Sequence, residues 1–249
     1  MSKNVVIIGG HGKVALRLTR LLSSSHNLTS VIRSDSEDQI KDVVEAGSTP
    51  VVLSLEDAPQ SKFTDLFNKT KADVVYFTAG AGYKASEERT KKVEYEGVLK
   101  VLDAIESVDS TLKKPRFLII SALDVRDPNK IPEHYNEEDK RLSERMRQVM
   151  PAYFQWRYEA DKNLVARTAF KWTILRPGGL TDEPGVGKAS IGKTHLTVTI
   201  SRDDFASILA SLLDREDASG LAIDTVGGST PIAEGLDTFI ARGETDWIG

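Results

Sequence analysis

The sequence contains no cysteine among its 249 residues. Disulfides and thiol nucleophiles are therefore excluded, and the composition fits a reducing compartment. No apolar run approaches the ~18 residues that a membrane helix needs, and the first residues lack the basic segment and apolar core of a signal peptide. We therefore expect a cytoplasmic protein with no membrane contact.

Metal ligands and an excess of positive charge are also missing. The histidines, which are His11, His26, His134 and His195, are scattered without ligand spacing, so no metal site is expected. Lysine and arginine total 33 against 37 acidic residues, giving a net charge of −4. Nucleic-acid binding depends on cationic contacts with phosphates, so a nucleic-acid partner is not expected. Apolar residues at 40% and charged residues at 28% are ordinary for a globular protein.

What the chain does contain is an alternation of strand-like and helix-like segments. Continuous branched apolar runs predict buried strands, and the 3.6-residue apolar period predicts helices between them. This alternation favours a doubly wound parallel α/β sheet covered on both faces. The expected strands are 5–8, 28–33, 50–53, 73–78, 116–121 and 172–175, and the expected helices are 13–24, 38–46, 63–69, 87–107 and about 137–167 with an interruption near Pro151.

The sequence shows no linker or repeat, so we expect one domain spanning residues 1–249. Residues 180–249 are expected to form a small C-terminal lobe on the substrate side, above the carboxyl edge of the sheet. Within it, residues 181–192 are rich in glycine and predict a loop. The mixed charge run from Glu137 to Arg147 predicts a solvated helix face.

A glycine turn separates the first expected strand from the first helix. Its spacing is Gly9-x-x-Gly12-x-x-Ala15, directly after Val5–Ile8. Small residues allow the backbone to approach a pyrophosphate, and free amides at a helix start attract its charge. The turn therefore predicts a dinucleotide site. His11 lies inside it, either beside the phosphate or turned to solvent.

The end of the second expected strand indicates which dinucleotide is bound. An NAD site places an acidic residue about 20 residues past the turn, whereas an NADP site accommodates the 2′-phosphate with arginine. Here the strand ends in Arg33 and Ser34, and Asp35 follows. A guanidinium pairs with phosphate and stacks on adenine, so the sequence favours NADP(H) over NAD(H). The alternative is that Arg33 is a solvated surface residue.

Several later motifs resemble those of a known family. They are Ala79-Gly80-Ala81-Gly82, Ser121 at a strand end, Thr173-Ile-Leu-Arg-Pro-Gly-Gly-Leu-Thr-Asp182 and Ile200-Ser-Arg-Asp-Asp-Phe-Ala206. In this order and spacing they resemble the atypical short-chain dehydrogenase/reductases, most closely the NmrA-like and flavin-reductase-like branch. The resemblance implies an NAD(P)-binding Rossmann fold and oxidoreductase chemistry.

The resemblance also implies cofactor roles at the matching positions. The pyrophosphate would lie along Gly9, Gly12, Lys13 and Val14, the adenosine end would meet Arg33 and Ser34, the nicotinamide ribose would meet Ala79, Gly80 and Ala81, and the nicotinamide itself would lie near Pro177, Gly178 and Gly179. One position departs from the family: Ser54 and Leu55 follow the third strand, where these proteins often carry an aspartate that contacts adenine.

The sequence offers two alternative positions for the catalytic tyrosine. Similar reductases use Tyr-x-x-x-Lys as proton donor and ribose ligand, with a serine on the preceding strand. Tyr158 and Lys162 match literally, but counting back from Thr173 puts Tyr153 and Arg157 in the family's Tyr and Lys places. The two tyrosines point about 140° apart on a helix, so both cannot serve. We favour Tyr153 and Arg157, with Ser121 either orienting a carbonyl or capping the next turn.

These observations lead to two hypotheses of different class. The first is an NADPH-dependent oxidoreductase that passes hydride to a small carbonyl, quinone or flavin-like acceptor. The second is a non-catalytic NADP(H) sensor that acts through a protein partner. Arginine in the lysine place favours the second, because its forked head poorly replaces a lysine ammonium. Retention of Tyr153 and Ser121 favours the first.

Overall fold

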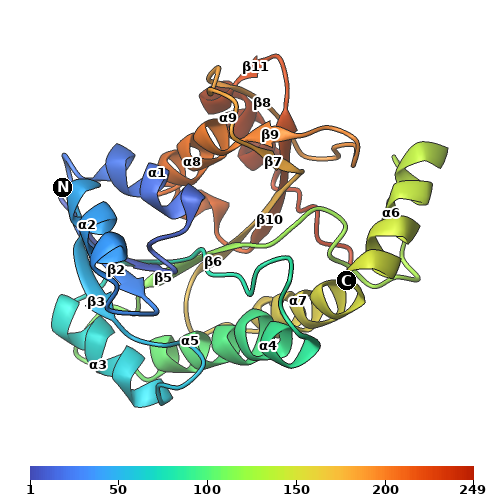
Figure 1. Ribbon diagram of the computed structural model, residues 1–249. Helices are drawn as coiled ribbons and strands as arrows, with labels where there is room; N and C mark the ends of the chain where they lie inside the picture. Colours follow the sequence, from blue (N-terminus) through green and yellow to red (C-terminus); the bar gives the residue numbers. More distant parts are fainter.

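The computed structural model describes residues 1–249 and is built around one nine-stranded sheet (Figure 1). Seven neighbouring strands, β3, β2, β1, β4, β5, β6 and β10, pair in parallel. At one edge β8 pairs antiparallel with β10, and β11 pairs antiparallel with β8. In spatial order the strands are β11 (Thr230–Pro231), β8 (Lys188–Ile191), β10 (Leu221–Gly227), β6 (Trp172–Pro177), β5 (Arg116–Ile120), β4 (Val74–Phe77), β1 (Asn4–Ile8), β2 (Asn27–Ile32) and β3 (Thr49–Val52). The expected doubly wound fold is therefore confirmed.

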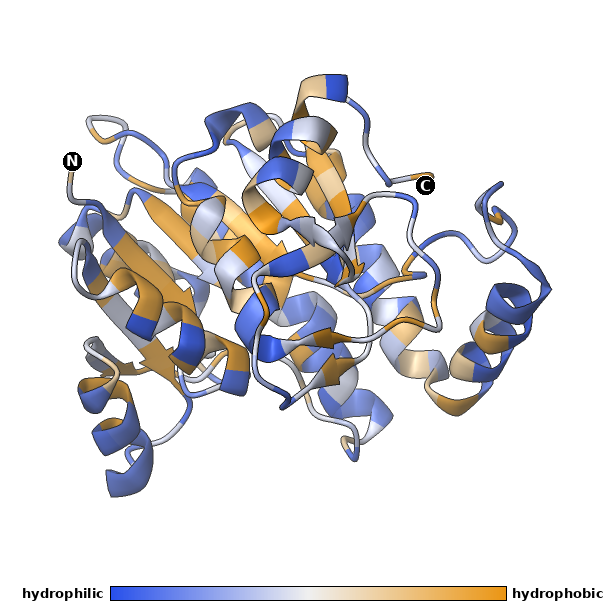
Figure 2. Cartoon of the chain, turned by 90° about the horizontal axis from the view of Figure 1, so that it is seen from above, coloured by the Kyte–Doolittle hydropathy of each residue, from blue (hydrophilic) through white to orange (hydrophobic).

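The apolar run of β1 accounts for its central place. Side chains alternate across a strand, so Val5 and Ile7 enter the core on one face while Val6 and Ile8 enter the core on the other. All four are at most 1% exposed. Figure 2 shows the apolar strands enclosed by helices whose outer sides are hydrophilic.

Helices cover both faces of the sheet. On the face of Val5 and Ile7 lie α1 (Lys13–Leu22), α8 (Arg202–Ser211) and α9 (Ile232–Arg242), and on the other face lie α3 (Gln60–Thr70), α5 (Gly97–Glu106) and α7 (Pro151–Val165). The remaining helices are α2 (Glu37–Glu45), α4 (Glu87–Lys91) and α6 (Glu137–Val149), with a short 3₁₀ turn at Glu216–Ala218.

The helix expected over 87–107 is continuous but not regular. Between α4 and α5 it contains a π-helical segment, Lys92–Glu96. A π segment holds one more residue per turn and shifts the helix face beyond it, and such segments are frequent at functional sites. Glu94 lies within this segment, and its side chain is only 2% exposed.

Two other expectations need correction. Residues 181–192 are not all loop: β7 (Leu180–Thr181) pairs with β9 (Ile200–Ser201), and β8 joins the main sheet. The α6 charge run is not wholly solvated, because Asp139 is fully buried. Its carboxylate accepts hydrogen bonds from the backbone N–H groups of Asn136 and Leu196, which supply the compensation that a buried charge needs.

Candidate cofactor and acceptor site

Parallel strands place their carboxyl ends at one edge of the sheet. The glycine turn follows β1, Arg33 follows β2, the segment 78–82 follows β4, Ser121 follows β5, and Gly178 follows β6. Two cavities open along this edge, and Thr78, Ala79 and Gly80 line both of them. The edge between β1 and β4 is where the strand order reverses, which is where open α/β sheets bind ligands.

The first cavity, of about 280 Å³, lies at the glycine turn. Gly9 has φ +82°, and a Cβ there would lie 2.7 Å from the Ala79 backbone, so only glycine fits. No side chain caps the N-terminus of α1. Its first backbone N–H groups are therefore free to bind an anion beside the cavity, which suits a dinucleotide pyrophosphate.

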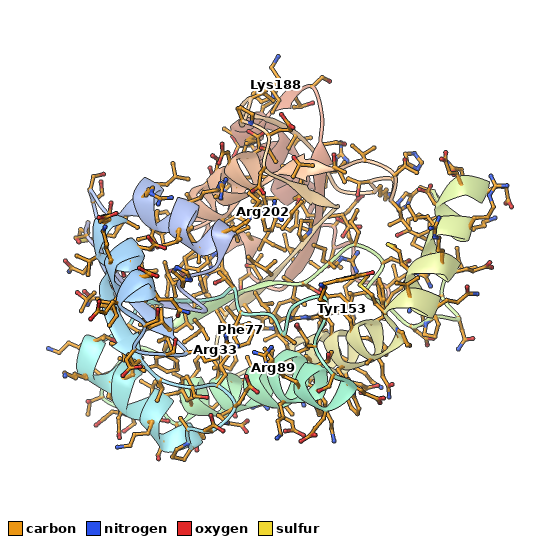
Figure 3. The ribbon with its side chains drawn as sticks, in the orientation of Figure 1. Arg33, Phe77, Arg89, Tyr153, Lys188 and Arg202 are labelled. Atoms are coloured by element: carbon orange, nitrogen blue, oxygen red, sulfur yellow. The ribbon has the colours of Figure 1, made fainter.

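Arg33, labelled in Figure 3, lines this first cavity. It is exposed and forms no ion pair in the structure, so its guanidinium is available to a ligand. His11 lines the same cavity, and its Nε2 lies 2.8 Å from Asp42 Oδ2. Arg89 also lines it and holds Glu56, with both Nε and Nη2 3.1 Å from Oε1.

Three of the residues expected at the cofactor do not line either cavity with their side chains. Lys13 reaches away to Asp182, with 2.7 Å between Nζ and Oδ2, and Val14 packs into the core at 8% exposure. Only their backbone amides, in the first turn of α1, lie where a pyrophosphate would bind. Ser34 is half-buried just past Arg33 and lies outside the cavity walls.

The second cavity is larger, about 690 Å³, and collects the residues expected at the nicotinamide end. Its wall includes Ala79 to Ala81, Ser121, Tyr153, Arg157 and Pro177 to Gly179. Tyr158 is not part of it. That ring stacks on Trp247 with centroids 5.8 Å apart, and Lys162 is exposed beside it. The frame containing Tyr153 is thus the one that faces the cavity.

Arg157 differs from the expected ribose ligand. It is 2% exposed and pairs with the carboxylate of Glu94, which is equally buried. The other carboxylate oxygen of Glu94 accepts a hydrogen bond from the Ala81 backbone N–H at 2.8 Å. The Arg157 guanidinium is therefore neutralised by Glu94 beneath the cavity, although its Nε and Nη1 have no hydrogen-bond partner.

The electrostatics around Tyr153 follow from this pair. Burial raises the pKa of the Tyr153 phenol to about 12, and the neighbouring Arg157 guanidinium offsets only part of that shift while Glu94 adds to it. Tyr153 therefore stays a neutral phenol throughout the physiological range. It can donate a hydrogen bond to a ligand, but it is a weak acid.

Ser121 is likewise engaged. Its Oγ donates to Asp161 Oδ2 at 2.5 Å, and Asp161 is fully buried. Burial raises the pKa of Asp161 to about 6 despite the nearby Arg157. While Asp161 is ionised, the hydroxyl hydrogen of Ser121 points to that carboxylate and not into the cavity. Its free lone pairs can only accept.

Glu94 and Asp161 are functional candidates that the motifs alone did not identify. Asp161 lies one turn from Arg157 on α7, and its spacing to Thr173 was the sequence feature that could have identified it. Glu94 lies four and seven residues before the inward Val98 and Val101, so the 3.6-residue period was the signal that could have placed it inside.

No helix combines the length and the apolar character required to cross a membrane.

Comparisons with known proteins agree with this geometry. The family model for NAD(P)H-binding proteins matches residues 9–216. The UPF0659 protein C216.03 of Schizosaccharomyces pombe is 36% identical over 246 residues, which cover 97% of each chain. The uncharacterized sugar epimerase YhfK of Bacillus subtilis is 32% identical over 93% of this chain and 98% of its own. A solved Bacillus halodurans protein, provisionally named an NAD-dependent epimerase/dehydratase, is 27% identical with a TM-score of 0.77, over 95% of this chain and 100% of that one.

Fold and site thus define a Rossmann-fold protein that binds a nicotinamide dinucleotide. The chain belongs to the NAD(P)H-binding family, and its resemblance to the atypical short-chain dehydrogenase/reductases is confirmed.

Proposed function

We propose that this protein is an NADPH-dependent oxidoreductase that passes hydride to a small acceptor. The observation that carries the proposal is the junction of the two cavities at Thr78 to Gly80. A dinucleotide whose phosphates meet the glycine turn would extend past this junction and place its nicotinamide in the larger cavity. In this arrangement a single domain holds the cofactor, and residues 180–249 supply part of the acceptor side.

The preference for NADP(H) rests on Arg33. It faces the adenosine end of the first cavity without an internal partner, and no carboxylate pairs with it. A 2′-phosphate would form an ion pair and hydrogen bonds with its guanidinium, whereas a ribose 2′-hydroxyl would offer only a neutral acceptor.

When bound, the reduced cofactor supplies a hydride, which carries two electrons to the acceptor. The chain's own residues orient both partners. Glu94 fixes the Ala81 N–H, and Arg89 Nη1 donates to the Ala81 carbonyl at 2.7 Å, so the segment beside the ribose is held from both sides. Pro177 and Gly178 line the larger cavity, in which the nicotinamide ring would lie.

The availability of a proton donor decides which acceptors the site could reduce. Tyr153 is a weak acid and Ser121 donates to Asp161, so neither is prepared to protonate a carbonyl oxygen. Quinones and flavins can take their proton from solvent after the hydride has arrived. Of the three acceptor classes, this site therefore favours quinones and flavin-like molecules over aldehydes and ketones.

The buried pair of Arg157 and Glu94 also favours the second candidate function, a sensor of NADPH. With Arg157 committed to Glu94, the lysine-type relay is missing, which fits a protein that binds NADPH without turning it over. The distinguishing measurement is NADPH oxidation, followed by nicotinamide absorbance, with quinone, flavin and aldehyde panels. Tight binding without turnover of any of them would refute the enzyme proposal.

Cofactor preference needs its own experiment. Arg33→Ala should weaken NADPH binding about 10- to 100-fold, the loss of a hydrogen bond to a charged group, and leave NADH binding unchanged. Arg20→Ala is the matched control, because Arg20 is exposed at the far end of α1 and lines neither cavity. Equal binding of NADH and NADPH by the wild type would refute the preference.

A further inference from the structure

Charged side chains are few in the acceptor cavity. Its wall contains Glu87, Glu94, Arg157 and Arg202. Glu94 and Arg157 neutralise each other, and Glu87 is exposed at the start of α4. Arg202 remains, and it approaches the cavity from the C-terminal part of the chain, across from Tyr153 in Figure 3.

Arg202 is only partly compensated. Its Nη1 lies 3.0 Å from Asp182 Oδ1, and this is its only ion pair. The same carboxylate also serves Lys13 at 2.7 Å and Arg17 at 3.6 Å, and Arg17 additionally pairs with Asp203. Three cations thus share two carboxylates, and the guanidinium of Arg202 keeps donors that these partners do not use.

The wall opposite Arg202 is apolar. It is formed where α6 meets α7 and by neighbouring loops, and its side chains include Met146, Val149, Met150, Pro151 and Phe154. Val149 is 57% exposed although it borders a cavity, so this apolar surface has no internal partner. Methionines suit flat or irregular ligands because their side chains adapt.

We propose that the acceptor is a molecule with an apolar ring body and an anionic group, a phosphate or a carboxylate, which Arg202 binds. The ring would lie against the apolar wall near Tyr153, and the anion would reach across the cavity to α8. This inference rests on the proposed oxidoreductase function and adds the chemical class of its substrate. An anion offers Arg202 a partner in a cavity otherwise free of unpaired positive charge.

The cofactor pyrophosphate is the other source of the same anionic chemistry. Asp182 links Arg202 to Lys13, whose backbone amide belongs to the glycine turn. If Arg202 served the pyrophosphate, its loss would weaken NADPH and every acceptor alike. If it serves the acceptor, only acceptors that carry the anionic group are affected.

The experiment compares FMN with riboflavin, which share one ring and differ by a phosphate. The kcat/KM of each is measured with NADPH for the wild type, Arg202→Gln, Arg202→Lys and the control Lys188→Gln. Lys188 is exposed on β8, lines neither cavity and lies at the tip of the C-terminal part in Figure 3. Lys188→Gln therefore changes the net charge by the same amount as Arg202→Gln but leaves the cavity wall intact. NADPH affinity and thermal unfolding are measured for each variant.

We expect Arg202→Gln to lower kcat/KM for FMN about 10- to 100-fold, with riboflavin and NADPH affinity unchanged. Arg202→Lys should recover part of the loss, and Lys188→Gln should have no effect. An unchanged FMN-to-riboflavin ratio, with or without weaker NADPH binding, would overturn the proposal.

A separate binding measurement tests the anion site if the proposed enzyme function fails. If no acceptor is turned over, FMN and riboflavin binding in the presence of NADP⁺, followed by flavin fluorescence, still tests Arg202. A phosphate-dependent difference that disappears in Arg202→Gln supports the anion site without turnover. Absence of that difference in the wild type contradicts it.

Discussion

Replacing Glu94 by glutamine isolates the charge of the buried pair. Glutamine keeps a carbonyl oxygen for the Ala81 N–H but leaves the Arg157 guanidinium without a counter-charge. Arginine cannot shed its proton, so the variant must bury an uncompensated cation. Breaking a buried ion pair from one side costs about 3–5 kcal/mol, and we expect the free energy of unfolding to fall by that amount.

The same change should act on Tyr153. With the Glu94 carboxylate gone, the unscreened Arg157 favours the phenolate, and the pKa of Tyr153 should fall from about 12 by roughly one unit or more. Each unit corresponds to about 1.4 kcal/mol. Tyr153 would then come closer to the acid that carbonyl reduction needs, so aldehyde turnover should rise relative to quinone turnover.

The assay is a spectroscopic titration of phenolate absorbance. Five other tyrosines contribute, so each protein is compared with its own Tyr153→Phe version and the difference is assigned to Tyr153. A double variant, Glu94→Gln with Arg157→Gln, removes both charges and serves as the control. It should regain part of the stability and should not show the lowered pKa.

Two results would refute this reasoning. The first is a Glu94→Gln protein within about 1 kcal/mol of wild-type stability, the range of an exposed pair. The second is a pKa of Tyr153 that stays unchanged in Glu94→Gln or falls equally in the double variant. Either would mean that Glu94 does not neutralise Arg157.

Three further predictions concern the turn, the buried acid and the two tyrosines. Gly9→Ala should abolish measurable NADPH binding and destabilise the fold by about 1–3 kcal/mol, because φ is +82° and the new Cβ would meet Ala79; calorimetry measures both. The pKa of Asp161 is raised by burial to about 6, so ionisation favours the unfolded state, and stability should fall as pH rises from about 4 to 6 by up to about 3 kcal/mol. Asp161→Asn should lack this contribution in chemical denaturation, and a slope identical to the wild type would contradict the assignment. Tyr153→Phe should retain quinone reduction without the loss of about 10²-fold or more that removing a general acid causes, and Tyr158→Phe should leave it unchanged; a larger loss in either variant would contradict the solvent-proton route.

Much of the scaffold could be predicted from local pattern. The apolar run Val5–Ile8 and the small residues after it leave few alternatives, because a buried parallel strand and a turn that tolerates no Cβ each demand those residue types. Arg33 could be placed at the cofactor edge because parallel topology puts every carboxyl end on the same side. The short β8, Lys188–Ile191, could not be predicted, since its strand character comes from pairing with distant β10.

The interior of the candidate site was less predictable than the strands around it. A 3.6-residue period puts Glu94 on the same helix face as Val98 and Val101, and the structure does bury its side chain. The period does not identify its partner. Arg157 lies on another helix, 63 residues along the chain, and only tertiary packing brings the two charges together.

The arginine at position 157 and the inward turn of Glu94 are best understood together. A buried lysine can lose its proton and needs no partner, whereas a buried arginine keeps its charge and requires an anion. Glu94 supplies that anion, and its charge opposes the lowering that the Arg157 guanidinium exerts on the pKa of Tyr153. The consequence reaches beyond one side chain. Glu94 also holds the Ala81 N–H, so the pair supports the segment after β4, and under the proposed oxidoreductase function the site would favour acceptors that take their proton from solvent.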